Sequence, residues 1–240
     1  MPPSQSLTAG IHETILILPG GGIHAHGVRR TGPETTAVLI ERRFASLCAV
    51  AGQQGRPIRL SVGHPDGRVE HHHIAIDGAI HLHQDPPLLN DATDPIWSQG
   101  IPEESNLLGS VRAAHRAGQW RAAQQAAHCA TGHLAARHGR DHPYVAMGIE
   151  LQAYFALLAE DLGTAAALYT DAAIAIHQLN GPRTQSRHDL ANAVAAWLRS
   201  DRDTRPGGPG FAIAHALIRI TPDDQTTLAA FLHRLTKEPR

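Results

Sequence analysis

This 240-residue sequence has two cysteines, few aromatic residues and a single lysine. Cys48 and Cys129 lie far apart in apolar, helix-like surroundings, which favours reduced thiols packed inertly in a cytosolic protein. Aromatic residues make up 4% of the chain, which argues against a surface that stacks nucleic-acid bases. No apolar run approaches the roughly 18 residues of a membrane span. We therefore expect a soluble, cytoplasmic protein.

An excess of one charge is also lacking. The chain has 21 lysine and arginine residues against 22 acidic ones, a net charge of -1, so no broad field exists to attract nucleic acid or a membrane. Every basic residue except Lys237 is arginine, and together with abundant alanine and glycine this indicates a GC-rich bacterial genome, such as that of an actinomycete. Hydrophobic residues at 42% exclude a chain that is disordered throughout.

The pattern changes from one half of the chain to the other. Residues 1–85 contain runs typical of strands with one helix between them, and residues 104–240 contain helical patterns only. The segment 86–103 between them is rich in proline, which predicts an extended linker in which Trp97 packs on a neighbouring surface. The predicted fold class is α+β, with a small antiparallel β-rich domain of order β-β-α-β-β-β followed by an all-α domain of helical hairpins with C-terminal capping helices.

Turn residues set the register of the β-rich domain. Tight turns with Asp-Gly or Gly-Gly chemistry separate the expected strands, which cover 14–18, 23–26, 58–62, 69–76 and 80–83, with the helix at 33–54. Three-residue turns at Pro65–Gly67 and Asp77–Ala79 place the apolar side chains of the last three strands on one face, as a floor for the helix. These are Ile58, Leu60, Val62, Ile74, Ile76, Ile80 and Leu82.

The same register gathers histidines on the opposite face of the predicted sheet. His71, His73, His81 and His83 lie there near Arg59, with His73 and His83 expected as cross-strand neighbours. One interpretation is a metal site, because His-x-His on a strand points both rings the same way. No acidic residue or cysteine joins that face, so a polar outer surface, or a contact surface for the second domain or another chain, is favoured.

Two short motifs beside the first turn are open to similar alternatives. His24-Ala25-His26 is interpreted in the same way as the histidine face. The run Gly20-Gly21-Gly22 lacks the Lys-Ser/Thr pair and the following helix start of a phosphate loop, so it is interpreted as a turn.

The helical half contains an internal repeat. Gly139-Arg140-Asp141-His142-Pro143 and Gly181-Pro182-Arg183 end successive helix pairs, and one shift aligns Trp120 with Leu162 and Ala123 with Ala165. Ala117 to Ala123 resembles the inter-helix turn of a tetratricopeptide repeat, and Gly139 to Ala146 resembles the inter-repeat segment of the kinesin light chain-like variety. The resemblance covers about residues 104–200. It departs from the family at Glu160, where the usual glycine is displaced to Gly163, and at the break 201–210.

The resemblance implies a solenoid whose first helices line a groove that binds a peptide or a partner helix. Positions that recur once per repeat are Leu108, Glu150 and Asn192, and one turn further on Arg112, Tyr154 and Ala196. The polar members, Arg112, Glu150, Tyr154 and Asn192, are the candidate partner-binding residues. Two and a half repeats are few for independent stability, so docking on the N-terminal domain or self-association is also expected.

The function favoured by these patterns is that of a non-enzymatic adaptor that binds a protein or peptide partner, without a cofactor. No Gly-x-Ser-x-Gly, His-Glu-x-x-His or Cys-x-x-Cys motif is present, and neither nucleic acid nor a membrane is expected as a partner. Two alternatives remain open. One is a metal-responsive protein that uses His71, His73, His81 and His83, and the other is a hydrolase with a site between the domains and histidines as bases.

Overall fold

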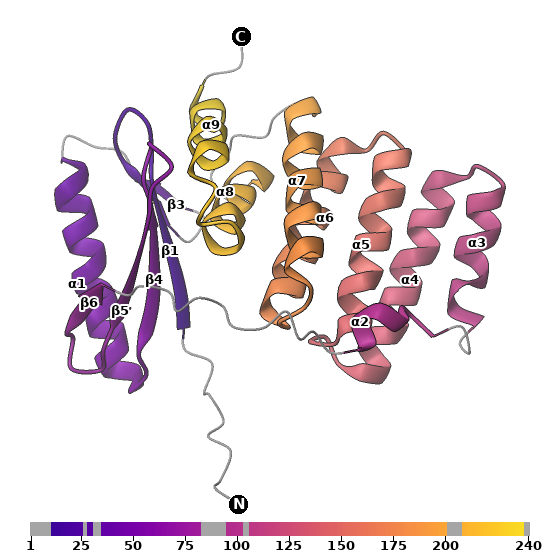
Figure 1. The fold of residues 1–240 in the computed structure, drawn as a ribbon, viewed down its shortest axis with the longest axis horizontal. Coiled ribbons are helices and arrows are strands. Elements are labelled where there is room, and N and C mark those ends of the chain that lie inside the picture. The colour runs from indigo at the N-terminus through magenta and orange to yellow at the C-terminus, as the bar shows by residue number, and fades with distance from the viewer. Residues whose placement is uncertain are drawn as a thin grey trace, which may run out of the picture.

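A six-stranded mixed sheet with one helix is followed by an all-helical region of packed helix pairs (Figure 1). The computed structural model describes residues 11–25, 28–30, 35–82, 95–102, 106–200 and 208–237. The predicted α+β class is thereby confirmed. None of the helices within these ranges is long and apolar enough to cross a bilayer.

The sheet has the strand order β3-β2-β1-β4-β5-β6. Its strands are β1 (Ile11–Ile17), β2 (Ile23–Ala25), β3 (Val28–Arg30), β4 (Ile58–Gly63), β5 (Val69–Ile74) and β6 (Ile80–Leu82). The prediction of an antiparallel sheet is wrong for one central pair, because β1 runs parallel to β4. Helix α1 (Thr36–Gln54) supplies the crossover that parallel neighbours require. Strand β3 was not predicted, since three residues that include two arginines carry no alternating pattern.

The turns between the last three strands explain the observed register. Pro65–Gly67 forms the predicted three-residue turn, closed by a 2.8 Å hydrogen bond from His64 N to Arg68 O. The second turn has the predicted length but covers 76–78, because Ala75 N donates to Ala79 O and Gly78, at φ 85, takes the last position. Ile76 therefore leaves the strand and is 51% exposed. The register moves by two residues, so each side chain keeps its predicted face.

Helix α1 covers the apolar face of the sheet, as expected. Leu47 and Ala51 of α1 pack against a buried cluster from the strands that consists of Ile15, Ile23, Ile58, Leu60, Val62 and Ile74. Ile80 and Leu82 share this face but remain exposed at the edge strand β6, beyond the reach of the helix.

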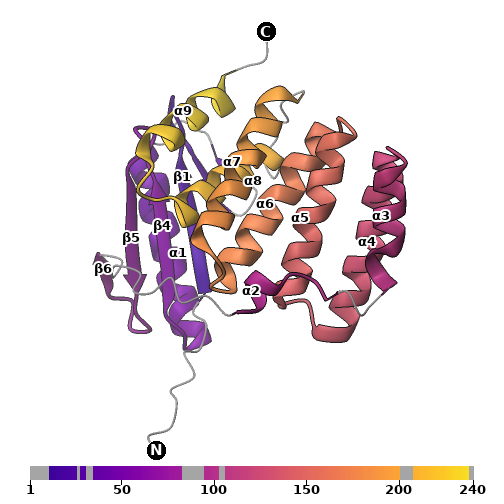
Figure 2. The ribbon, with the colours of Figure 1, turned by 45° about the vertical axis from the view of Figure 1, so that its right-hand side comes forward.

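The helical region is a row of antiparallel neighbours in which each helix packs on the next (Figure 2). It contains α3 (Gly109–Arg116), α4 (Trp120–His138), α5 (Pro143–Leu158), α6 (Leu162–Gln178) and α7 (Arg183–Arg199), after a single 3-10 turn at Asn106–Leu108. The described part of the linker forms α2 (Ile96–Gln99). Trp97 packs against Ala146 and Ile176 and is only 8% exposed, which confirms its predicted role.

The repeat alignment predicts the turns within the helix pairs. Gly118 and Glu160 occupy the same position of successive turns, and both are left-handed, at φ 67 and φ 58. This conformation costs free energy for a residue with a side chain, whereas glycine adopts it without that cost. Glu160, where the sequence departs from the resemblance, thus adopts a left-handed conformation without the freedom of a glycine.

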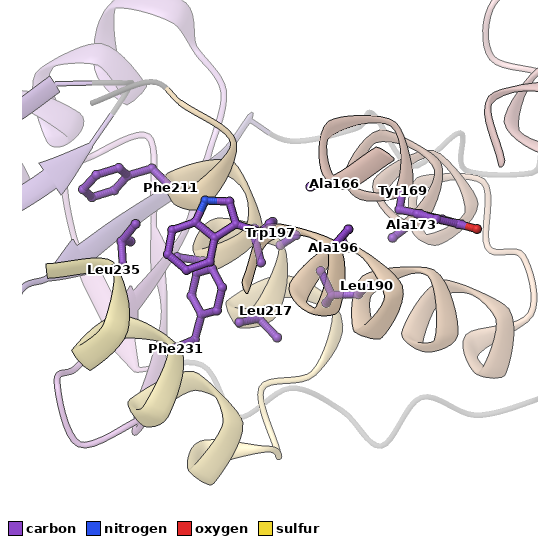
Figure 3. Packing of buried hydrophobic residues seen from close by; sticks show 14 of the residues in the cluster. Ala166, Tyr169, Ala173, Leu190, Ala196, Trp197, Phe211, Leu217, Phe231 and Leu235 are labelled. Atoms are coloured by element: carbon purple, nitrogen blue, oxygen red, sulfur yellow. The ribbon is translucent and has the colours of Figure 1, made fainter. Parts of the chain in front are cut away.

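The last two helices join the two halves of the chain. Helix α8 (Pro209–Ile220) packs on α6 and α7 and also on β1 and β4, and α9 (Gln225–Thr236) packs on α8 (Figure 1). One buried cluster contains Leu16 of β1 and Leu18 just after it. The same cluster contains Trp197, Phe211 and Phe231 (Figure 3). Helix α8 therefore packs on α7 and also links the helices to the sheet. It begins at Pro209, inside the predicted break 201–210, because proline is well suited to the first turn of a helix.

Candidate partner-binding face of the helical region

The four candidate residues lie on the first helices of successive pairs. Arg112 is exposed on α3, Glu150 and Tyr154 lie one turn apart on α5, and Asn192 lies half-buried on α7. Tyr154 is 41% exposed, which is unusual for a large aromatic side chain in this chain. The sequence argument therefore placed all four on the expected helices.

A side-chain hydrogen bond ties α5 to α7 at this face. Gln185 donates from Nε2 to Oε2 of Glu150 at 2.5 Å. Burial raises the pKa of Glu150, and the hydrogen bond from Gln185 and the charge of His188 only partly oppose it. Glu150 is therefore a half-buried carboxylate that the surrounding residues solvate incompletely.

A second carboxyl group lies within electrostatic reach of Glu150. Asp189, one turn after Gln185 on α7, is 0% exposed, and neither of its carboxylate oxygens has a hydrogen-bond partner. Burial, and then the charge of Glu150, raises the pKa of Asp189 to about 8. At neutral pH this group is mostly protonated, because its ionised form has no compensating partner.

Two tyrosines complete the surroundings of the carboxyl pair. Tyr169 of α6 is buried, and burial, followed by the charges of Asp189 and Glu150, raises its pKa to about 12. Tyr154 also contributes to that shift, so the four side chains lie within electrostatic reach of one another. The face thus has an exposed aromatic ring, a half-buried acid and a buried acid in sequence from outside to inside.

The structure brings only some of the four predicted partner-binding residues together. Glu150 and Tyr154 belong to one group with Gln185, Asp189 and Tyr169. Asn192 lies on the same side of α7 as Gln185, two helical turns further on, and Arg112 belongs to α3 at the other end of the row. Sequence reasoning missed Asp189. Asp189 lies on the same stripe of α7 as Gln185 and Asn192. The sequence comparison considered only positions that recur once per repeat and therefore did not include Asp189.

The histidine face was predicted in part correctly. His71 shares a hydrogen bond with Ser61, which in turn bonds His12, both at 2.9 Å. His73 lies between Arg59 and His81 across the strands, so the expected pairing of His73 with His83 is wrong, because the turn begins one residue early. His83 itself, like His26, lies outside the described residues.

The described residues of this face form neither a metal-binding group nor an open nucleophile. Within the described ranges, no three histidine, cysteine or acidic side chains are grouped closely enough to hold a metal ion. Ser61 is 1% exposed, so its hydroxyl cannot meet a substrate despite its two imidazole partners. Burial and the charge of Arg219 lower the pKa of His12 to about 4, so its ring is neutral.

The upper part of the same sheet face is a contact surface for the helices. His24 stacks on Phe211 with ring centroids 3.9 Å apart, and a Cβ at Gly63 would collide with Ile218. The interpretation of His24 as part of a contact surface agrees with this packing.

No family model, curated protein or solved structure matches the chain significantly.

Proposed function

We propose that the helical region binds a protein or peptide partner through the face formed by Glu150, Tyr154 and Asn192, and that the protein acts as a non-enzymatic adaptor. The observation that carries this proposal is Asp189, a fully buried acid without a hydrogen-bond partner whose pKa the charge of the half-buried Glu150 raises further. Buried polar groups in proteins are nearly always paired. Glu150, the partly exposed member of this carboxyl pair, is therefore suited to receive a donor from another molecule.

The chemistry of the face favours a cationic donor. An arginine or lysine beside Glu150 would satisfy its carboxylate and lower the cost of ionising Asp189. The exposed ring of Tyr154, one turn away, offers a cation-π and apolar contact of the kind found at binding hot spots. The resemblance of residues 104–200 to tetratricopeptide repeats supports the same use of first-helix positions. The partner in this proposal is a peptide segment with a basic side chain.

Selection from a displayed library of random peptides tests the proposal with purified full-length protein. Enriched peptides should share an arginine or lysine, and binding should weaken about tenfold or more when Glu150→Gln is combined with Asn192→Ala, because charge-assisted hydrogen bonds are lost. The double variant should still fold, since glutamine at position 150 keeps an oxygen that can accept the hydrogen bond from Gln185, and its melting is measured beside its binding. Gln125→Ala, an exposed change on α4, serves as the control. Peptides without a basic residue, or binding that survives the double variant, would contradict the proposal.

A further inference from the structure

A cleft of about 240 Å³ lies in the other half of the molecule, between the β2–β3 hairpin and α1. Leu39, Arg42, Arg43 and Ser46 line it from α1, and their spacing places them on one stripe of that helix. The hairpin contributes two cross-strand pairs, Ile23 with Arg30 and Ala25 with Val28. Residues from two elements therefore converge on one space.

The lining combines a cationic rim with an apolar floor. Arg30, Arg42 and Arg43 bring three guanidinium groups and Ser46 a hydroxyl, and none of the described lining residues is acidic. Ile23 is buried at the base, and Leu39 is half-buried beside it. An anion in this space would be attracted by all three guanidinium groups, of which Arg43 also has an ion pair with Glu13.

Arg43 has a hydrogen-bond donor that no acceptor in the described structure satisfies. Its Nη2 atom makes a long contact of 3.5 Å to Oε2 of Glu13, and its Nε atom is buried without a hydrogen-bond partner. A buried donor that has lost water and gained no acceptor costs free energy. An acceptor bound in the cleft would remove that cost.

We propose that this cleft binds a small organic anion, with a phosphate or carboxylate head held by Arg30, Arg42 and Arg43 and a short apolar body on Ile23 and Leu39. Guanidinium groups match the oxygen spacing of these head groups and bind them in bidentate fashion. The volume lies below the usual range for drug-sized ligands, so the ligand is a small one. This site is separate from the helical face and does not depend on the function proposed for it.

Titration calorimetry of the full-length protein with phenyl phosphate, benzoate and inorganic phosphate tests the proposal. We expect phenyl phosphate or benzoate to bind, and the tighter of the two identifies the head group. Inorganic phosphate should bind more weakly than phenyl phosphate, because it leaves the apolar floor unused. No saturable binding of either organic anion at millimolar concentration, or equal binding of inorganic phosphate, would overturn it.

Matched arginine variants locate the binding. Arg30→Gln and Arg43→Gln should each weaken binding about tenfold, the loss expected for a charge-assisted hydrogen bond. Arg29→Gln is the control, since Arg29 adjoins Arg30 on β3 but faces the other side of the sheet, opposite His24. If Arg43→Gln fails to fold, Arg30→Gln at the sheet edge still decides. An equal loss with Arg29→Gln would mean that only the general charge of the strand attracts anions.

Discussion

Nδ1 of His24 in β2 lies 2.9 Å from Nε2 of His215 in α8, and this hydrogen bond links the sheet to the C-terminal helices. His24 is buried and stacks on Phe211, and its Nε2 atom has no hydrogen-bond partner. Burial, with a smaller contribution from the charge of Arg29, lowers the pKa of His24 to about 4. The junction between the two halves is therefore built around a neutral imidazole.

Acid should loosen this junction. The unfolded chain has a histidine pKa of about 6.5, so it binds a proton more readily than folded His24 does. The contribution of His24 to stability should be complete above about pH 6.5 and be lost by about 1 kcal/mol per pH unit as the pH falls toward 4. His24→Gln should flatten that loss in denaturant titrations from about pH 7.5 to 5. His133→Gln, an exposed change on α4, should leave the slope unchanged, and an unaltered slope in His24→Gln would contradict the account.

Asp189 should give the opposite dependence on pH. Its folded pKa of about 8 lies above the value of about 3.9 for an unfolded aspartate, so the folded state retains the proton. Stability should therefore fall as the pH rises between these values, by about 1 kcal/mol per unit, and level off above about pH 8. Asp189→Asn should remove this fall. The exposed Asp141→Asn is the control, and a variant that melts in parallel with the parent at every pH would refute the assignment.

Replacing Glu160, which is left-handed in its turn, with glycine should stabilise the protein. Glu160→Gly should raise the free energy of unfolding by about 0.5–1 kcal/mol, because glycine adopts φ 58 without strain. Gly118→Ala, at the equivalent turn, should lower it by about 1 kcal/mol. Gly163→Ala is a further check, because Gly163 lies in α6 with open space around it and should tolerate the methyl group. Destabilisation by Glu160→Gly would contradict the equivalence of the two turns.

A pair of substitutions that compensate each other in size tests the packing of α8 on the sheet. The Cβ of Gly63→Ala would collide with Cδ1 of Ile218, so the variant should lose about 1–3 kcal/mol. Ile218→Val removes that carbon, and the double variant should recover part of the loss in a double-mutant cycle. Gly132→Ala, on α4 with no atom nearby, should cause no comparable loss. Strictly additive effects of the two changes would mean that the halves are not packed as described.

Local patterns predicted most of the secondary structure and missed what depends on long-range packing. The alternation from Ile58 to Ile74 and the glycine turns set the faces of the sheet correctly. The parallel pairing of β1 with β4 could not be predicted from the sequence, since no local pattern specifies which strand lies beside another. The second turn was misplaced by one residue because the position of Gly78 in the loop was not considered.

The residues of the candidate site were likewise predicted only in part. Repeat equivalence identified Glu150 and Tyr154, since both occupy recurring positions on first helices. Asp189 and Gln185 were missed because their importance arises from α5 and α7 lying side by side. For His24 the sequence left a polar outer surface and a contact surface as alternatives, and only the packing of Phe211 on its ring decides for the contact surface.

Photo-cross-linking from position 154 tests the central claim most directly. Benzoylphenylalanine in place of the exposed Tyr154 should form a covalent adduct with a selected basic peptide, and the same residue at Gln125 on α4 should not. The peptide is added to both proteins at a concentration that saturates each, so that only the position of the probe differs on illumination. An adduct at Tyr154 alone is the result predicted here. Equal adducts at both positions, or an adduct only at Gln125, would place the partner elsewhere and contradict the account.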